Sequence, residues 1–495
     1  MQSVATTRRN FLKLAGATAV SIPSFKLHAQ QDGGHPDTSA PSANYTLHIQ
    51  NGLIEIGKNR FVSTTTFNGQ FPGPLLRFRE GEQTTVAIHN DTDVPEQLHW
   101  HGQMIPVDVD GAAEEGTPFI PPHGVRTISF VPRPSGLRFY HTHIRAGDDL
   151  NRGQYTGQVG PVYIEAKQNP GRYDREVFLT LKEFEPWFSH GGDMANDFLA
   201  GAEVKELKDR GESEMAASLK SGQPHGFEVN YRTFTINGRM LGQGEPIRVK
   251  QGERVLFHVL NGSATEIRSL ALPGHTFSVV AMDGNRIPKP VQVPVLWLGT
   301  AERISAVVEM DHPGVWILGD LADDDRHHGM GIVVEYAGQQ GKPQWMAPKQ
   351  VHWNYAHFGN SKGQAAQPDD TFVMTFAKQN AALHGFNRWT INGTAYPDTQ
   401  MMSQPLFHIT QGKRYRIRMR NASDDIHPIH LHRHSFELTR IAGQATSGVL
   451  KDVVMLGGYQ EAEVDFVADN PGMTLFHCHQ QLHMDFGFMC LFNYV

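Results

Sequence analysis

Apolar and polar residues alternate in short runs along most of the chain. Residues 86–88, 255–257 and 415–419 are examples, and turn-forming residues flank each run. A period of two is typical of β-strands that bury one face. The pattern predicts an all-β protein of many short strands, with one exception. Residues 193–220 are rich in Ala, Glu, Lys and Leu and are expected to be helical.

One set of turn signals occurs three times. Each copy opens on an Asn-Gly pair, continues to a strand that ends in Asn, and closes on a turn with Pro and Gly before an aromatic-rich strand. The pairs lie at 68–69, 237–238 and 392–393, and the strand-ending residues are Asn90, Asn261 and Asn421. Such spacing predicts a β-sandwich or Greek-key barrel repeated three times.

Polar stretches with Gly and Pro near residues 170 and 345 mark the expected domain boundaries. The predicted domains are 30–170, 171–345 and 346–495, with segment 193–220 as an insertion in the second. A length of 495 residues agrees with three domains, since one domain takes roughly 100–200 residues.

Composition narrows the class of protein further. The 49 Gly, 29 Pro and 19% charged residues suit a turn-rich β protein. The net charge is -7 and the chain has no basic run, so the sequence indicates no positively charged surface for nucleic acid or an anionic membrane. Neither partner is expected. Two cysteines are too few for a disulfide framework, and Cys490 is expected to be a buried strand residue.

The first 29 residues are predicted to be a targeting signal. Arg8-Arg9 precede a mild apolar run at 14–22 and a small residue, Ala29, where cleavage is expected. This order is typical of a twin-arginine signal, and the run is too short to span a bilayer. A periplasmic or secreted location follows. An anchoring helix or a disordered basic tail is the alternative interpretation.

The candidate chemistry lies in four histidine motifs. Two alternate residues of a strand project to one face, so each His-x-His pair directs two imidazoles to one place. Two pairs belong to the first domain and two to the third, where the last pair encloses a cysteine: His99 and His101, His141 and His143, His430 and His432, His477 and His479 around Cys478.

The middle copy is an internal control. It has apolar or uncharged residues where the other copies have paired histidines, so the fold does not require them. Its His275 aligns with His434, which is therefore expected to be structural.

One thiolate with imidazoles, without Cys-x-x-Cys pairs, suits a trigonal His₂Cys copper centre. Cys478, His427 and His483 supply that set. Eight further histidines suit additional copper. Zinc is the alternative metal, but it cannot do redox chemistry by itself.

These four motifs, in this order and split between the first and last of three domains, resemble those of the multicopper oxidases, the laccase family. The resemblance implies three consecutive cupredoxin-like Greek-key β-barrels and four coppers per chain: one type 1, one type 2 and two type 3. It implies these ligands: His427, Cys478 and His483 for type 1; His99 and His430 for type 2; His101, His141 and His479 for one type 3 copper; His143, His432 and His477 for the other.

The resemblance also suggests roles for neighbouring residues. Asp110 matches the family's carboxylate and is the candidate proton relay, although an Asp before a Gly is also a common turn residue. The family's second acid is replaced by Met484, and Asp485 is a possible substitute. Phe488 falls at the axial position of the type 1 copper as a non-ligand, with Met489 as the alternative.

The implied activity is that of a laccase. Electrons from phenols or aromatic amines pass from Cys478 through His477 and His479 to dioxygen, which is reduced to water. A metallo-oxidase of Cu(I), Fe(II) or Mn(II) is the alternative, with acidic residues such as 323–325 as possible metal sites. A copper electron-transfer protein needs only the type 1 set and leaves the other eight histidines unexplained. Each chain holds all the ligands, so a monomer is expected.

Overall fold

The computed structural model describes residues 43–166, 172–190, 220, 225–349, 352–360, 363, 365–398 and 407–495. The predicted signal 1–29 lies outside these residues, as does the insertion 193–220 apart from Lys220, so both stay predictions. None of the described helices has the length and apolar content that crossing a bilayer requires.

The first unit pairs its strands in two sheets, β2-β1-β4-β6 and β3-β8-β7-β5. Its elements are β1 (Tyr45–Gly57), β2 (Arg60–Phe67), β3 (Leu76–Arg79), β4 (Thr84–Asn90), β5 (His99–His101), α1 (Val107–Asp110), the 3₁₀ turn η1 (Ala113–Glu115), β6 (Val125–Phe130), β7 (Gly136–His141), η2 (Gly153–Tyr155) and β8 (Val159–Glu165).

The second unit has the sheets β10-β9-β12-β17-β14-β15, β11-β19-β18 and β13-β16. Its elements are β9 (Arg175–Ser189), β10 (Glu228–Ile236), β11 (Ile247–Val249), β12 (Arg254–Asn261), β13 (Arg268–Leu270), β14 (Phe277–Met282), β15 (Asn285–Val293), β16 (Leu296–Leu298), β17 (Arg303–Glu309), β18 (Val315–Gly319), α3 (Asp323–His327) and β19 (Gly331–Tyr336).

The third unit has the sheets β21-β20-β23-β28-β25-β26 and β22-β30-β29-β24-β27. Its elements are η3 (Tyr355–Phe358), β20 (Asp370–Leu383), β21 (Phe386–Ile391), β22 (Phe407–Ile409), β23 (Arg414–Asn421), β24 (His427–Leu431), β25 (Phe436–Ile441), β26 (Gln444–Lys451), β27 (Val453–Leu456), β28 (Glu461–Val467), β29 (Thr474–Cys478), α4 (Gln481–Asp485) and β30 (Met489–Tyr494).

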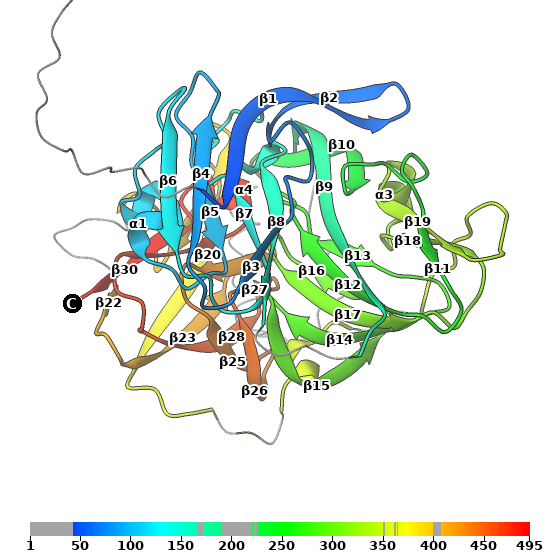
Figure 1. Ribbon diagram of the computed structural model, residues 1–495. Helices are drawn as coiled ribbons and strands as arrows, with labels where there is room; N and C mark the ends of the chain where they lie inside the picture. The colour runs from blue at the N-terminus through cyan, green and yellow to red at the C-terminus, as the bar shows by residue number, and fades with distance from the viewer. Residues whose placement is uncertain are drawn as a thin grey trace, which may run out of the picture. The chain divides into compact units, whose positions relative to one another are not determined.

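The three units repeat one topology, which Figure 1 shows as the blue-to-cyan, green and yellow-to-red strands. In each unit the long first strand pairs antiparallel with the next in the same sheet and parallel with a later one, as β1 does with β2 and β4. The structure is 52% strand and 6% helix. The all-β class and the three cupredoxin-like units predicted from the sequence are thus confirmed.

The repeated Asn-Gly signals have a repeated structural role. Each Asn and each Gly has a positive φ, as a tight turn requires. Each Asn Oδ1 also accepts a backbone N–H from the neighbouring strand: Asn68 from His48 at 2.6 Å, Asn237 from Thr180 at 2.7 Å and Asn392 from Thr375 at 2.8 Å. The same short side chain therefore fixes the first strand pair of every unit.

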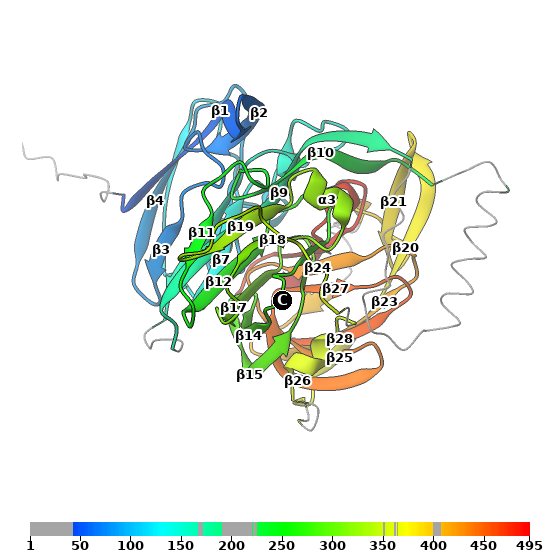
Figure 2. The ribbon, with the colours of Figure 1, turned by 90° about the vertical axis from the view of Figure 1, so that its right-hand side faces the viewer.

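The boundary predicted near residue 170 falls outside the described residues. The boundary near residue 345 lies between β19 and η3. Both positions stay predictions. The second and third units also share one continuous apolar core, and β15 lies beside β26 (Figures 1 and 2).

Backbones from the first two units approach closely at Gly136 and Gly284. Gly136 has a φ of +109°, and a Cβ added there would lie 2.0 Å from the carbonyl oxygen of Gly284. Gly412 has a φ of +84° with open space around it.

Gly136→Ala should therefore destabilise the protein more than Gly412→Ala. Positive φ alone costs a non-Gly residue about 1–3 kcal/mol, and only Gly136→Ala adds a backbone clash. Denaturant titration of both variants measures the difference. Equal losses of unfolding free energy would contradict the close approach at Gly136.

Candidate metal centre

Two pairs of neighbouring strands carry the candidate histidines. In the first unit β5 pairs with antiparallel β7, which places His99 opposite His141. In the third unit β24 pairs with β29, which places His430 opposite His477, one residue before Cys478. Because strand residues i and i+2 face the same way, His99 and His101 of β5 direct their imidazoles to one side. The second histidines of the other pairs lie one or two residues past the ends of β7, β24 and β29: His143, His432 and His479.

The eight paired histidines meet in one cluster built from the first and third units. Each of these side chains is 2% exposed or less. Three groups of ligand atoms lie within 4.8 Å of one another: His99 with His430 and His432, His99 with His101 and His141, and His143 with His432 and His477. The ring of His479 completes the cluster, with its centroid 5.0 Å from that of His101 and 5.1 Å from that of His141.

Cys478, His427 and His483 form a second buried group. The Cys478 Sγ lies 3.6 Å from the Nδ1 of His427 and 3.4 Å from the Nδ1 of His483, and the two nitrogens are 3.1 Å apart. His483 follows Cys478 by five residues and lies in α4, which places its ring beside the cysteine. Three donor atoms at similar separations suit a trigonal His₂Cys ion site.

Phe488 lies against this second group, with its ring centroid 4.8 Å from that of His427. Met489 instead packs in a separate apolar cluster with Leu475 and Leu491. A phenyl ring therefore contacts one histidine of this group.

The hydrogen bonds of the imidazoles leave one nitrogen of most rings directed into the cluster. The Nδ1 atoms of four rings bond to backbone carbonyls, namely His99 to Asp110 at 2.9 Å, His141 to Thr142 at 2.7 Å, His430 to Asp452 at 2.7 Å and His477 to Cys478 at 2.9 Å. Among the described residues, the Nε2 atoms of His99, His141 and His430 have no hydrogen-bond partner, although all are buried.

Buried nitrogens without partners are costly, and a metal ion satisfies them. The Nε2 atoms of His432 and His477 face each other at 3.1 Å, which also suits a shared metal site. The residues present therefore fit a group of metal ions with imidazole ligands.

The electrostatics point the same way. Burial, followed by the neighbouring imidazoles, lowers the pKa of His101, His141, His430, His432, His477 and His479 well below the ordinary value. These rings are therefore neutral, which is the form that binds metals. Burial also raises the pKa of the Cys478 thiol, so a thiolate there needs a bound cation.

Asp110 lies within the cluster, as the sequence led us to expect. Its Oδ2 is 3.0 Å from the Nδ1 of His432 and 3.1 Å from the Nδ1 of His99. Burial acts to raise the pKa of Asp110, but the interactions with His99, Glu115 and Arg433 together outweigh it and the pKa is lowered. Burial and the charge of Asp110 raise the pKa of the adjacent Glu115 well above its usual range. Glu115 is therefore the member of this pair that holds a proton.

Three other carboxylates at the cluster were not predicted from the sequence. Glu114 Oε2 lies 3.4 Å from the Nδ1 of His143, and Glu115 Oε1 lies 3.5 Å from the Nδ1 of His432. Asp452 is bonded to His101. No motif marks these residues, because their proximity to the histidines arises only from tertiary folding.

Two residues with uncertain roles in the sequence have defined contacts. His434 bonds to the His432 carbonyl and to Tyr494, which repeats the contacts of His275 with the Pro273 carbonyl and with Tyr336. This supports a structural role for His434.

Asp485 accepts backbone N–H groups of Ala146 at 2.9 Å and Gly147 at 2.8 Å. These hydrogen bonds fix the loop at Ala146 and Gly147, which follows His143. Cys490 is fully buried in β30, as expected.

Comparisons with known proteins agree with this geometry. Family models described as "Multicopper oxidase" match residues 48–169, 204–334 and 365–495. The chain is 29% identical over 473 residues to "Multicopper oxidase MmcO" of Mycobacterium tuberculosis, covering 92% of this chain and 88% of that protein.

A "Copper resistance protein A homolog" of Pseudomonas syringae pv. tomato is 29% identical over 374 residues, which cover 70% of this chain and 61% of that protein. The crystal structure of Fet3p, described as a multicopper oxidase that functions in iron import, has a TM-score of 0.71 and 17% identity. It covers 91% of this chain and 90% of that chain.

Adding copper(II) to the metal-free protein should raise its melting temperature, because the donor atoms are already assembled in the fold. A free copper concentration of about 100 times the dissociation constant stabilises the folded protein by about 2.7 kcal/mol for each site. The copper-induced shift should be reduced in His432→Gln and retained in His434→Gln, a neighbouring histidine outside the cluster. Differential scanning calorimetry measures it, and equal shifts in the two variants would contradict the ligand assignment.

Proposed function

Because the chain belongs to the multicopper oxidase family, we propose that it passes electrons one at a time from a reducing substrate to dioxygen and makes water. Use of dioxygen and a reducing substrate is common to the family. One observation carries the proposal for this chain. Cys478 belongs to the buried group with His427 and His483. Its chain neighbours His477 and His479 belong to the eight-histidine cluster.

Copper is the family's metal, and we assign four coppers to this chain. The type 1 copper takes His427, Cys478 and His483; the type 2 copper takes His99 and His430; the type 3 pair takes His101, His141 and His479 on one side and His143, His432 and His477 on the other. Bound copper supplies the one-electron redox couple at the first site and the reduction of dioxygen at the cluster.

The protein supplies the path between these sites. The backbone of Cys478 leads directly to His477 and His479, and the Cys478 carbonyl also accepts the Nδ1–H of His477 at 2.9 Å. An electron therefore has both covalent and hydrogen-bonded routes of a few bonds.

The protein also supplies protons, which the reduction of dioxygen consumes. Asp110 contacts His99 and His432, and Glu115 lies beside it. We assign Asp110 Oδ2 as the atom that delivers protons to the cluster, with Glu115 as the neighbouring carboxyl that resupplies it.

The first candidate substrate is a phenol or aromatic amine. Phe488 beside His427 supports this assignment, because a phenyl ring offers no ligand atom, and a bound copper that lacked a thioether ligand would have a higher potential. Trp389 covers the site, with its ring centroid 4.1 Å from that of His483, and both side chains are 1% exposed or less. We place the entry of electrons from an aromatic substrate at Trp389, because its ring packs against His483.

A reduced metal ion is the second candidate, and a group of carboxylates near Trp389 favours it. Asp424 and Asp425 bind Lys378 at 2.5 and 2.8 Å, and the Lys378 Nζ lies 5.7 Å from the Trp389 ring centroid. Burial and the charge of Asp425 raise the pKa of the nearby Glu228 well above its usual range. Asp424 and Asp425 together exceed the charge of the one ammonium by a single negative charge, which would attract a cation.

The acidic residues 323–325 have other partners, because Asp325 binds Arg268 at 2.6 Å and Asp323 binds Arg326. We do not assign a metal site there.

Cys478→Ser should abolish the blue absorption and turnover while the fold is retained, because the hydroxyl cannot replace the thiolate as a copper ligand. Absorption spectra and oxygen uptake test activity, and circular dichroism tests folding. Retained oxidase activity in the folded variant would contradict the assignment.

Asp110→Asn should lower kcat by about 10²–10⁴-fold, the usual contribution of a positioned acid. Oxidation of the substrate by the type 1 copper without dioxygen should be unchanged, since Asp110 lies at the cluster. Stopped-flow reduction under anaerobic conditions separates the two steps. A variant that is slowed only in the anaerobic step would overturn the role given to Asp110.

Oxygen uptake with 2,6-dimethoxyphenol, and separately with cuprous, ferrous or manganous ions, distinguishes the two substrates. If a metal ion is the substrate, Asp425→Asn should lower kcat/KM for that ion at least about tenfold, equivalent to about 1.4 kcal/mol. The exposed Asp323→Asn should leave kcat/KM unchanged. Faster uptake with the phenol and equal metal oxidation by both variants would favour the laccase.

A further inference from the structure

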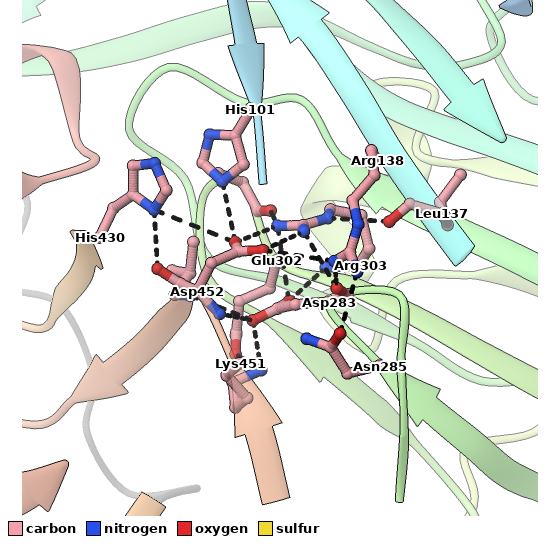
Figure 3. Close-up of polar contacts among 12 residues, drawn as sticks. His101, Leu137, Arg138, Asp283, Asn285, Glu302, Arg303, His430, Lys451 and Asp452 are labelled. Atoms are coloured by element: carbon pink, nitrogen blue, oxygen red, sulfur yellow. Dashed lines mark hydrogen bonds and ion pairs between the residues drawn. The ribbon is translucent and has the colours of Figure 1, made fainter. Parts of the chain in front are cut away.

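A buried network of charged residues joins all three units beside the histidine cluster (Figure 3). Each side chain in it is 1% exposed or less. The cations are Arg138 of the first unit, Arg303 of the second and Lys451 of the third; the carboxylates are Asp283 and Glu302 of the second unit and Asp452 of the third. The three positive and three negative charges give the network no net charge. This favours a structural role over a role in supplying protons.

Asp452 connects this network to two cluster histidines. Its Oδ1 accepts the Nε2–H of His101 at 3.0 Å, and its backbone carbonyl accepts the Nδ1–H of His430 at 2.7 Å. His101 thus presents Nδ1 to the cluster, and His430 presents Nε2. Both nitrogens are buried without a partner among the described residues. A single residue therefore selects which nitrogen each ring offers to a metal.

Arg303 fixes the Asp452 carboxylate. Its Nη1 and Nη2 donate to Oδ1 and Oδ2 at 2.6 Å each, a paired geometry that only a guanidinium provides. Arg303 is itself held by the carbonyls of Ala301 at 2.9 Å and Leu137 at 3.4 Å. The second of these carbonyls belongs to the first unit.

The same guanidinium also lies close to the ring that supports His101. The Arg303 Cζ is 5.6 Å from the ring centroid of Phe139, and Phe139 stacks on His101 at 4.3 Å. A Cβ at Gly102 would lie 2.6 Å from both the Arg303 Nη2 and the Asp452 Oδ2. Gly102 therefore leaves the space in which the pair forms, immediately after His101.

We propose that Arg303 is a positioning residue for the copper cluster, although it comes from the middle unit, whose sequence has no His-x-His pair. Through the Asp452 carboxylate it sets the orientation and the ligating nitrogen of His101, and it anchors the residue whose backbone carbonyl orients His430. The inference rests on the proposed copper function. The middle unit then contributes to the reaction, because its Arg303 helps to position metal ligands that the other two units supply.

Arg303→Lys and Asp452→Asn test the inference in the copper-loaded full chain. Lysine keeps the charge of Arg303 but cannot make the paired contact. Asparagine keeps the shape of Asp452 but offers Arg303 an amide in place of one oxygen. Asp465→Asn is the matched control, because Asp465 is also fully buried and binds two arginines, Arg414 at 3.1 Å and Arg416 at 2.7 Å, in the same unit.

Arg303→Lys and Asp452→Asn should weaken copper binding at the cluster about 10- to 100-fold, as chelator competition measures it. The near-ultraviolet band of the coupled copper pair should fall and the type 2 electron paramagnetic resonance signal should change, while the blue type 1 band remains. Asp465→Asn should keep all three signals, even if its melting temperature falls as far.

Three results would overturn the inference: full cluster signals and affinity in Arg303→Lys, equal loss of the type 1 and cluster signals, or the same spectral loss in Asp465→Asn. If Asp452→Asn does not fold, Arg303→Lys alone decides. A wild-type protein without cluster signals would instead contradict the proposed function, so the two failures are distinguishable.

Discussion

Ten imidazoles and the Cys478 thiol lie buried in the two candidate metal sites, and the requirement to satisfy their polar atoms determines most of the surrounding structure. Several of the rings bond one nitrogen to a backbone carbonyl or a carboxylate and direct the other toward neighbouring histidines. The hydrogen bonds orient the rings, and burial keeps them neutral. The result is a set of donor atoms that becomes favourable only when metal ions occupy it.

This constraint explains why distant strands must meet accurately. The cluster takes histidines from β5, β7 and the residues just after β7 in the first unit. It takes the others from β24, β29 and the residues just after these strands in the third. Neither unit holds a complete cluster, so their relative position matters as much as their internal folds. The balanced charge network around Arg303 and Asp452 is buried where the three units meet. Breaking one partner of such a buried pair costs about 3–5 kcal/mol, which opposes displacement of the units.

Local signals were enough to predict much of the fold and of the metal-binding groups. Asn68, Asn237 and Asn392 each occupy a tight turn, and the His-x-His spacing marks side chains that meet in the cluster. Asp452, Arg303 and Glu115 could not be predicted in this way. Asp452 lies 351 positions from His101 in the chain, and their contact depends on how complete units pack. Sequence spacing identifies ligands within one strand pair, but it does not identify the residues that hold separate strand pairs together.

The most direct measurement is the ratio of dioxygen consumed to electrons supplied by a one-electron donor such as ferrocyanide, with hydrogen peroxide assayed in the same sample. If the histidine cluster completes the reduction, the copper-loaded protein consumes one dioxygen for every four electrons and releases no peroxide. One dioxygen for every two electrons, with peroxide accumulating, would contradict the account.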